Sequence, residues 1–202
     1  MLGIPGHPDY ARAWDGLQVE GPAEITKVTA AVDASEATIR EAAARGADLR
    51  PVRHGLFWDG GLPVTGRRYR KLRALLEHGM ALCSAHLPLD GHPDVGNSAL
   101  LARALGLAPA GRFGEFEGVP IGWWGTLDEP VGVERLASRR RSGGPVHVVA
   151  GGPALAEKVA VVTGGAGSCL AEAAAVGLDA HAAYVGERFG LEWGFVDLPT
   201  GL

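Results

Sequence analysis

The sequence predicts an α/β protein in which mixed or mainly parallel sheets are flanked by helices in two similar lobes. Short apolar runs alternate with amphipathic helical segments, and glycines stand where several of those helices would end. The chain has 202 residues, of which 47% are hydrophobic and 21% charged, enough to bury a sizeable core. We expect residues 1–202 to form a single domain, with lobes at 1–108 and 131–202 joined by a connector at 109–130.

The first half of the chain predicts three strand and helix units. The strands are expected at residues 27–33, 48–54 and 80–85, and the helices at 34–45, 66–78 and 97–105. For such a series, parallel pairing with right-handed crossovers is the default. The inward stripes of the second and third helices are expected to contain Tyr69, Leu72, Leu75 and Leu76, and Leu100, Leu101 and Leu105.

The second of these strands has an unusual composition. Arg50, Pro51 and Arg53 stand where a buried parallel strand is normally a nearly continuous apolar run. Proline also lacks the N–H that a sheet ladder needs. We therefore expect this segment to be an edge strand or to have lost its strand structure.

The second half of the chain repeats the α/β style. The region 109–130 is rich in glycine, proline and aromatic residues, and it predicts either the connector or a small antiparallel element around 121–126. After it we expect a helix near 131–140, strands at 146–150 and 158–163, and a helix that runs to residue 176.

Charge and cysteine content exclude several classes of function. The net charge of −4 gives no electrostatic reason to expect nucleic acid or an anionic membrane as a partner. The arginine-rich runs at 67–71 and 139–141 are typical of solvated helix faces. Cys83 and Cys169 are far apart and predict free thiols in a reducing compartment. With no signal-like or membrane-spanning apolar run, the chain is expected to be cytoplasmic.

Side chains of metal-ligand type follow two of the predicted strands. The first loop carries Arg53 and His54, and the second carries His86, Asp90 and His92. Parallel sheets build their sites where the strands end, and imidazole and carboxylate groups are common metal ligands. His54 and Asp90 are the candidate ligands of a divalent metal, and the other three residues are additional candidates for the site.

Each of these residues also has a structural alternative. His54 could be a histidine satisfied at a strand end, and Asp90 a loop or helix-capping carboxylate. His86 could pack or form a hydrogen bond beneath its loop, and His92 could form the turn before Pro93. Arg53 could simply point to solvent.

A glycine-rich turn is the rival site. Gly164, Gly165, Gly167 and Ser168 lie between a predicted strand and a helix, where backbone N–H groups can bind a phosphate. The turn lacks the lysine of a P-loop, and Leu170 stands where a dinucleotide fingerprint needs its last glycine. A tight turn without a ligand is the alternative.

The landmarks together resemble one family. They include the Leu87-Pro88-Leu89-Asp90 motif followed by Gly96-Asn97, and they occur in family order at 14–21, 32–34, 53–58, 85–97 and 162–168. The chain is similar to the dinuclear-metal proteins called GTP cyclohydrolase 1 type 2 homologs, or Ngg-interacting-factor-three-like proteins. The resemblance implies a toroidal homohexamer and two divalent metals, Zn, Mn, Fe or Mg, held by three histidines, an aspartate and a glutamate.

The chain departs from the family pattern at two places. Arg53 stands where the family has the first of two adjacent histidines, so that only His54 and Asp90 match ligand positions. The family's C-terminal Gly-His-x-x-Thr-Glu element has no counterpart, since His181 and Glu187 have the wrong spacing, and we expect several tens of residues to be absent near them. Arginine cannot ligate a metal. Its guanidinium could instead take the place of the lost metal and pair with Asp90 or a phosphate.

Three functions are compatible with this pattern. The first is a metal-binding protein with metal-dependent hydrolase activity, expected to be impaired, on a nucleotide or another phosphorylated small molecule. The second is a metal-depleted, non-catalytic member that acts in assembly or binding. The third is a metal-free phosphate binder that uses the turn at 164–168.

Overall fold

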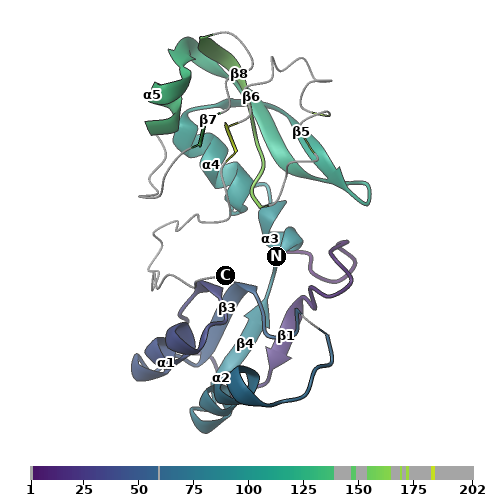
Figure 1. Ribbon diagram of the computed structural model, residues 1–202, viewed down its shortest axis with the longest axis vertical. Coiled ribbons are helices and arrows are strands. Elements are labelled where there is room, and N and C mark those ends of the chain that lie inside the picture. Colours follow the sequence, from purple (N-terminus) through teal and green to yellow (C-terminus); the bar gives the residue numbers. More distant parts are fainter. Residues whose placement is uncertain are drawn as a thin grey trace. The chain divides into compact units, whose positions relative to one another are not determined.

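A computed structural model describes residues 2–58, 60–138, 147–148 and 154–164, together with Cys169, Glu172 and residues 183–184. The described residues form two compact units that divide between His86 and Leu87. Each unit combines a sheet with helices, so the predicted α/β class with helix-flanked sheets is confirmed (Figure 1). Residues 109–130 lie within the second unit.

The sheet of the first unit has a parallel core. Its strands are β1 (Gly16–Val19), β2 (Ala31–Asp33), β3 (Leu49–His54) and β4 (Ala81–Ser84), in the order β1-β4-β3-β2. β2 pairs with β3 and β3 with β4 in parallel, as the sequence predicts, whereas β1 joins the outer edge of β4 antiparallel. The parallel strands therefore all end at one edge of the sheet.

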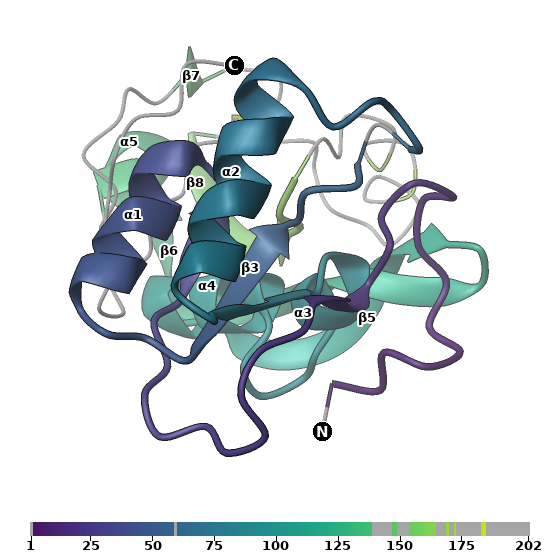
Figure 2. The same ribbon diagram turned by 90° about the horizontal axis from the view of Figure 1, so that it is seen from below.

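Two helices cover one face of this sheet. Figure 2 shows α1 (Glu36–Ala44) and α2 (Gly66–Glu77) side by side. Ser35 caps α1, because its hydroxyl group accepts a hydrogen bond from the N–H of Thr38. The core between helices and sheet contains Ile39, Leu75 and Leu82, all fully buried.

The predicted inward stripe of α2 is partly wrong. Leu75 is fully buried and Leu72 packs against the core, but the side chains of Tyr69 and Leu76 are 49% and 67% exposed. One residue corresponds to 100° around a helix. Tyr69 and Leu76 therefore lie beside the stripe that Leu75 presents to the sheet, on the solvent side of it.

The expectation that residues 48–54 form an edge strand or no strand is also wrong. β3 is an internal strand with a neighbour on each side. Thr29 donates its N–H to the carbonyl of Leu49, and the next bond of a parallel ladder would lead from residue 51 to the Thr29 carbonyl. Pro51 has no N–H, and Nη1 of Arg50 lies 3.5 Å from that carbonyl instead. The proline interrupts the ladder at a single position, and pairing continues on both sides of it.

The second unit is built on an antiparallel sheet. Strands β5 (Ala108–Phe116), β6 (Val119–Gly132) and β8 (Leu155–Val161) form the sheet in the order β5-β6-β8, and β7 (His147–Val148) pairs with β9 (Ala183–Tyr184). Its helices are α3 (Leu87–Asp90), α4 (Asn97–Leu105) and α5 (Val133–Ser138). Figure 1 shows α4 beside the sheet, and its Leu101 and Leu105 belong to one buried cluster with Leu127 and Val161.

A tight turn explains why residues 109–130 form part of a hairpin. Phe116 pairs with Val119, so only Glu117 and Gly118 connect β5 to β6. Both have positive φ angles, 48° and 82°, which is the geometry of a type I′ turn. Of the two alternatives for this region, the antiparallel element describes the segment, with strands longer than expected. The predicted helix up to residue 176 lies mostly outside the described residues.

Candidate functional site

Polar and aromatic side chains gather where the parallel strands of the first unit end. β2 ends at Asp33 and β3 at His54, which are partners in the strand register, and His86 follows shortly after β4. The rings of His54 and His86 have centroids 5.5 Å apart, and Trp58 lies against both, at 5.8 and 4.7 Å. We call His54, Trp58 and His86 the ring cluster. It occupies the edge at which α/β sheets place ligand sites.

An aspartate orients the imidazole of His54. Nδ1 of His54 lies 2.6 Å from Oδ1 of Asp33. A carboxylate only accepts hydrogen bonds, so the proton is on Nδ1 and the lone pair of a neutral ring is on Nε2. Such a carboxylate partner is typical of metal-binding and catalytic histidines.

Arg53 contacts the other nitrogen of the same ring. Its Nη1 group donates a hydrogen bond to Nε2 of His54. A single tautomer of His54, with its proton on Nδ1, therefore satisfies both Asp33 and Arg53. The consequence is that a guanidinium cation lies at the lone pair that a metal ion would use.

His86 has two carboxylate partners. Its Nδ1 lies 2.9 Å from Oδ1 of Asp9, and its backbone N–H donates to Oδ1 of Asp15 at 2.8 Å. The side chains of Asp9 and His86 are each only 7% exposed. His86 is thus a second imidazole with a carboxylate on Nδ1, beside the first.

Asp15 is a perturbed carboxyl group. Partial burial and a hydrogen bond with the Asp9 carboxyl group raise the pKa of Asp15 from 3.8 to about 7, against the lowering effect of the His86 N–H. Two carboxyl groups in one partly buried place share a proton more easily than they both ionise. The pair can therefore hold a proton near neutral pH.

A glutamine connects the ring cluster to the start of the chain. The side-chain amide of Gln18 donates to the carbonyl of Trp14 and accepts from the N–H of Leu56, both at 2.7 Å. Gly55 makes this approach possible, because a Cβ atom there would overlap the Gln18 amide. The loop that carries Trp58 is held in this way.

Asp90 and His92 belong to the second unit. Asp90 is fully buried at the end of α3 and accepts a hydrogen bond from Nδ2 of Asn97 at 2.7 Å. Nδ1 of His92 accepts from the N–H groups of Asp94 and Val95, at 3.1 and 3.3 Å, so His92 has the turn-forming role that is its structural alternative. Within the described ranges, no three histidine, cysteine or carboxylate side chains are grouped as metal ligands.

Most of the glycine-rich turn lies outside the described residues, including Gly165, Gly167 and Ser168. Gly164 has a φ of 97°, and Thr163 before it is fixed by Ser98, whose hydroxyl group accepts from the Thr163 N–H at 3.2 Å. The structure thus describes only where the turn starts, and phosphate binding there stays a prediction.

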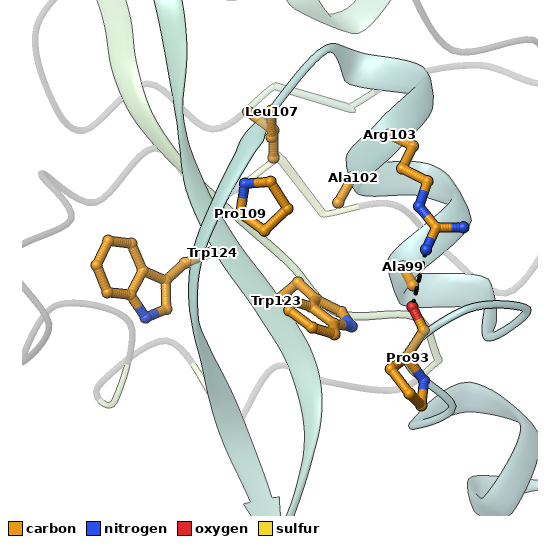
Figure 3. A pocket seen from close by; sticks show the side chains of 8 residues that line it. All are labelled: Pro93, Ala99, Ala102, Arg103, Leu107, Pro109, Trp123 and Trp124. Atoms are coloured by element: carbon orange, nitrogen blue, oxygen red, sulfur yellow. Dashed lines mark hydrogen bonds between the residues drawn. The ribbon is translucent and has the colours of Figure 1, made fainter.

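The second unit has a small apolar pocket of about 50 Å³ between α4 and the sheet. Figure 3 shows Trp123 pointing towards α4, and Arg103 donating to the carbonyl of Pro93 at 3.1 Å. Its lining is Pro93, Ala99, Ala102, Arg103, Leu107, Pro109, Trp123 and Trp124. The lining residues include no carboxylate, imidazole or thiol group.

Three site residues, Asp9, Asp15 and Asp33, were not among the predicted candidates. Asp33 had a detectable signal, because it ends a predicted strand next to the strand of His54. Asp9 and Asp15 had none, since they meet His86 across 77 and 71 residues of sequence.

The fold and the ring cluster define a two-unit α/β protein with carboxylate-oriented histidines at the edge of a parallel sheet. The chain belongs to the Duf34/NIF3 (NGG1p interacting factor 3) family, whose sequence profile matches residues 6–183. In the described part of the chain, no helix is long and apolar enough to cross a membrane.

Relatives in sequence carry the name GTP cyclohydrolase 1 type 2 homolog. The Deinococcus radiodurans protein is 36% identical over 239 residues, which covers 100% of this chain and 90% of the relative. The Halobacterium salinarum protein is 45% identical over 179 residues, an alignment that covers 85% of this chain and 71% of the relative. The first alignment is longer than the 202 residues of this chain, so that relative carries residues that this chain lacks.

Solved structures show the same fold. The protein ybgI, described as of unknown function, superposes with a TM-score of 0.78 at 39% identity and covers 88% of this chain and 71% of that chain. TTHA1606 from Thermus thermophilus has a TM-score of 0.70 at 32% identity, and the match covers 95% of this chain and 91% of that chain.

The described residues do not fit the two-metal centre that the resemblance implies. The metal-binding lone pair of His54 accepts a hydrogen bond from Arg53, and a guanidinium cation has no lone pair to offer to a metal. A metal ion at Nε2 would also be repelled by the guanidinium charge at short range.

Proposed function

We propose that this protein is a metal-depleted member of the Duf34/NIF3 family that acts by binding, with Arg53 as the cationic group of the site. The observation that carries this proposal is the hydrogen bond from Nη1 of Arg53 to Nε2 of His54. The guanidinium brings a permanent positive charge to the strand edge where a metal would otherwise bring one.

The ligand class that suits this site is a phosphorylated small molecule. Arginine forms charge-assisted and often bidentate hydrogen bonds with phosphate. The planar guanidinium group also matches the geometry of two phosphate oxygens, which a lysine ammonium does not. Assembly into a homo-oligomer, a hexamer by family resemblance, belongs to the same proposal.

The competing function is metal-dependent hydrolysis with Zn, Mn, Fe or Mg. The short contact between His54 and Asp33, 2.6 Å, favours it, because a carboxylate on Nδ1 is the usual support of a metal-bound imidazole. It requires Arg53 to leave Nε2 of His54, and ligands beyond His54 and Asp90.

Metal content separates the two functions. Protein purified without chelator or affinity-tag metal is measured by plasma mass spectrometry, alongside Asp90→Ala and Arg53→His variants. The proposal expects background metal in the wild type and in Asp90→Ala. Near-stoichiometric metal that falls in Asp90→Ala would contradict the proposal and justify a hydrolase screen. A gain of metal in Arg53→His would identify Arg53 as the group that excludes it.

Ligand binding is tested by calorimetric titration with pyrophosphate. Arg53→Gln is expected to weaken binding at least about tenfold, the effect of losing one charge-assisted hydrogen bond. Arg45→Gln is the matched control, because Arg45 is exposed directly after the end of α1 and pairs with Glu41. Equal affinity in all three proteins would exclude Arg53 from phosphate recognition.

A further inference from the structure

Residues 7–15 lie against the ring cluster without forming a helix or strand. We call this segment the strap. It belongs to the same compact unit as His54, Trp58 and His86. It forms no helix or sheet hydrogen bonds of its own, apart from a turn bond from the Ala13 N–H to the Tyr10 carbonyl, and it is held by side-chain contacts with His86 and by the buried Ala13.

Two aspartates fasten the strap to His86. Asp9 binds Nδ1 of the imidazole at 2.9 Å, and Asp15 accepts the backbone N–H of the same residue at 2.8 Å. With these contacts in place the His86 residue is only 5% exposed. The strap therefore holds one face of His86 by its side chain and its backbone together.

Tyr10 adds a ring contact between these two fastenings. Its ring centroid is 5.9 Å from that of His86 and 6.4 Å from that of Trp58. The Tyr10 residue is itself 53% exposed, so it contacts the ring cluster on one side and solvent on the other. Its ring is an outer cover of the cluster.

The strap ends at a strained chain reversal. Trp14 has a φ of 47°, which is unfavourable for a bulky side chain, and Gly16 follows at 103°. Trp14 is 64% exposed, so the burial of its side chain does little to offset this conformation. The Gln18 amide holds the Trp14 carbonyl at 2.7 Å. These residues are where the backbone angles would change if the strap moved.

We propose that the strap is a removable cover of His86. In the closed state, described above, Asp9 and Tyr10 block the imidazole. In the open state the chain pivots at Trp14 and Gly16, and the imidazole becomes accessible beside His54. This goes beyond the proposed function and does not depend on it, since it concerns access to one histidine in the protein alone.

The test measures the accessibility of His86 directly. Wild type, Asp9→Ala and the control Asp128→Ala, an exposed aspartate of the second unit, react with diethyl pyrocarbonate, and modification is followed peptide by peptide by mass spectrometry. Asp9→Ala is expected to raise the rate at His86 about tenfold, because one hydrogen bond to a charged group is lost. The rate at His92, in the other unit, is expected to stay unchanged, as are all rates in Asp128→Ala.

An unchanged rate at His86 in folded Asp9→Ala would overturn the proposal. Should that variant fail to fold, hydrogen exchange on the wild type decides. The amide of His86 is expected to exchange together with the strap and faster than the amides of β3. Exchange of the strap as slow as that of β3 would show that it opens only with the whole unit, and the proposal would be wrong.

Discussion

Asp15 accepts the backbone N–H of His86 at 2.8 Å while its own carboxyl group lies beside that of Asp9. The first contact favours the ionised form of Asp15, and the second, together with burial, favours the protonated form. Burial and Asp9 prevail, since the pKa rises to about 7. The fastening of the strap is therefore coupled to protonation of the same carboxyl pair.

This coupling predicts how stability depends on pH. Between pH 3.8, the unperturbed pKa of Asp15, and about 7, the folded state binds more protons than the unfolded state. The free energy of unfolding should therefore fall as pH rises through this window and level off above it. Because the group is half-buried and screened by solvent, we expect a loss on the order of 1 to 2 kcal/mol.

Asp15→Asn is expected to remove this contribution and to be more stable than the wild type at pH 8. Urea unfolding at pH 5 and pH 8 measures the free energy of unfolding of both proteins, and Asp128→Asn is the control for general charge effects. A wild type whose pH dependence matches that of Asp15→Asn would exclude Asp15 as the responsible group.

The burial of the Arg50 guanidinium predicts that an apolar residue at this position would stabilise the fold. Its residue is fully buried, and within the described part of the chain Nε and Nη2 have no hydrogen-bond partner. Burial lowers the pKa of Arg50 to about 10, so the cation destabilises the fold at neutral pH. Arg50→Leu should raise the free energy of unfolding by about 1 to 4 kcal/mol.

Thermal and urea unfolding at pH 7 check the Arg50→Leu variant. Arg73→Leu is the control, because Arg73 is exposed and pairs with Glu77 in the same helix, an ion pair that contributes little. A loss of stability in Arg50→Leu would mean that the guanidinium is well paired. For the wild type itself, stability should rise as pH increases above about 10.

The close packing of the Gln18 amide against Gly55 predicts that a larger residue at position 55 destabilises the fold. A Cβ atom at residue 55 would overlap the Gln18 amide, which is held by Trp14 and Leu56 and cannot move without losing those hydrogen bonds. Gly55→Ala should therefore cost about 1 to 2 kcal/mol in unfolding free energy. Gly61→Ala is the matched control, because nothing lies within 4 Å of its Cβ position. Equal stabilities of the two variants would contradict this account.

Asp33 predicts the tautomer of His54. Long-range ¹H–¹⁵N spectra of the wild type should show the proton on Nδ1 of His54, as its contacts with Asp33 and Arg53 require. In the double variant Asp33→Leu and Arg53→Leu, which has neither the acceptor at Nδ1 nor the donor at Nε2, the ring should populate the other tautomer, and the population of the Nδ1–H form should fall severalfold. His92, which accepts at Nδ1 from backbone N–H groups, serves as the internal reference. A tautomer of His54 that does not change in the double variant would show that these two contacts do not set it.

The local pattern of the sequence was sufficient for much of the first unit. Apolar runs and glycine helix ends predicted β2, β4, α1 and α2, because strand and helix periodicities are properties of neighbouring residues. Strand ends also predicted the place of His54, and hence the edge of the sheet where the ring cluster lies. Residues 109–130 are compatible with a connector as well as with a hairpin, because the turn at Glu117 and Gly118 depends on two positive φ angles, one of them at a non-glycine residue.

The position of β3 shows where local reasoning failed. Arg50 and Pro51 argue against an internal strand when only the strand itself is considered. The structure keeps β3 internal because β2 and β4 pair with it on either side of the proline, and the loss of a single ladder bond is smaller than the gain from burying Val52 and Leu82.

The sequence by itself determined the family, the α/β class and the residue types at the strand ends, because each depends on residues close together in the chain. Only the tertiary structure decided that Asp9 and Asp15 meet His86, and that the guanidinium of Arg53 turns to Nε2 of His54. The first of these bridges more than 70 residues. The second depends on a side-chain rotamer, which no periodicity records. Long-range packing determines both sets of contacts, and these contacts determine what the site can bind.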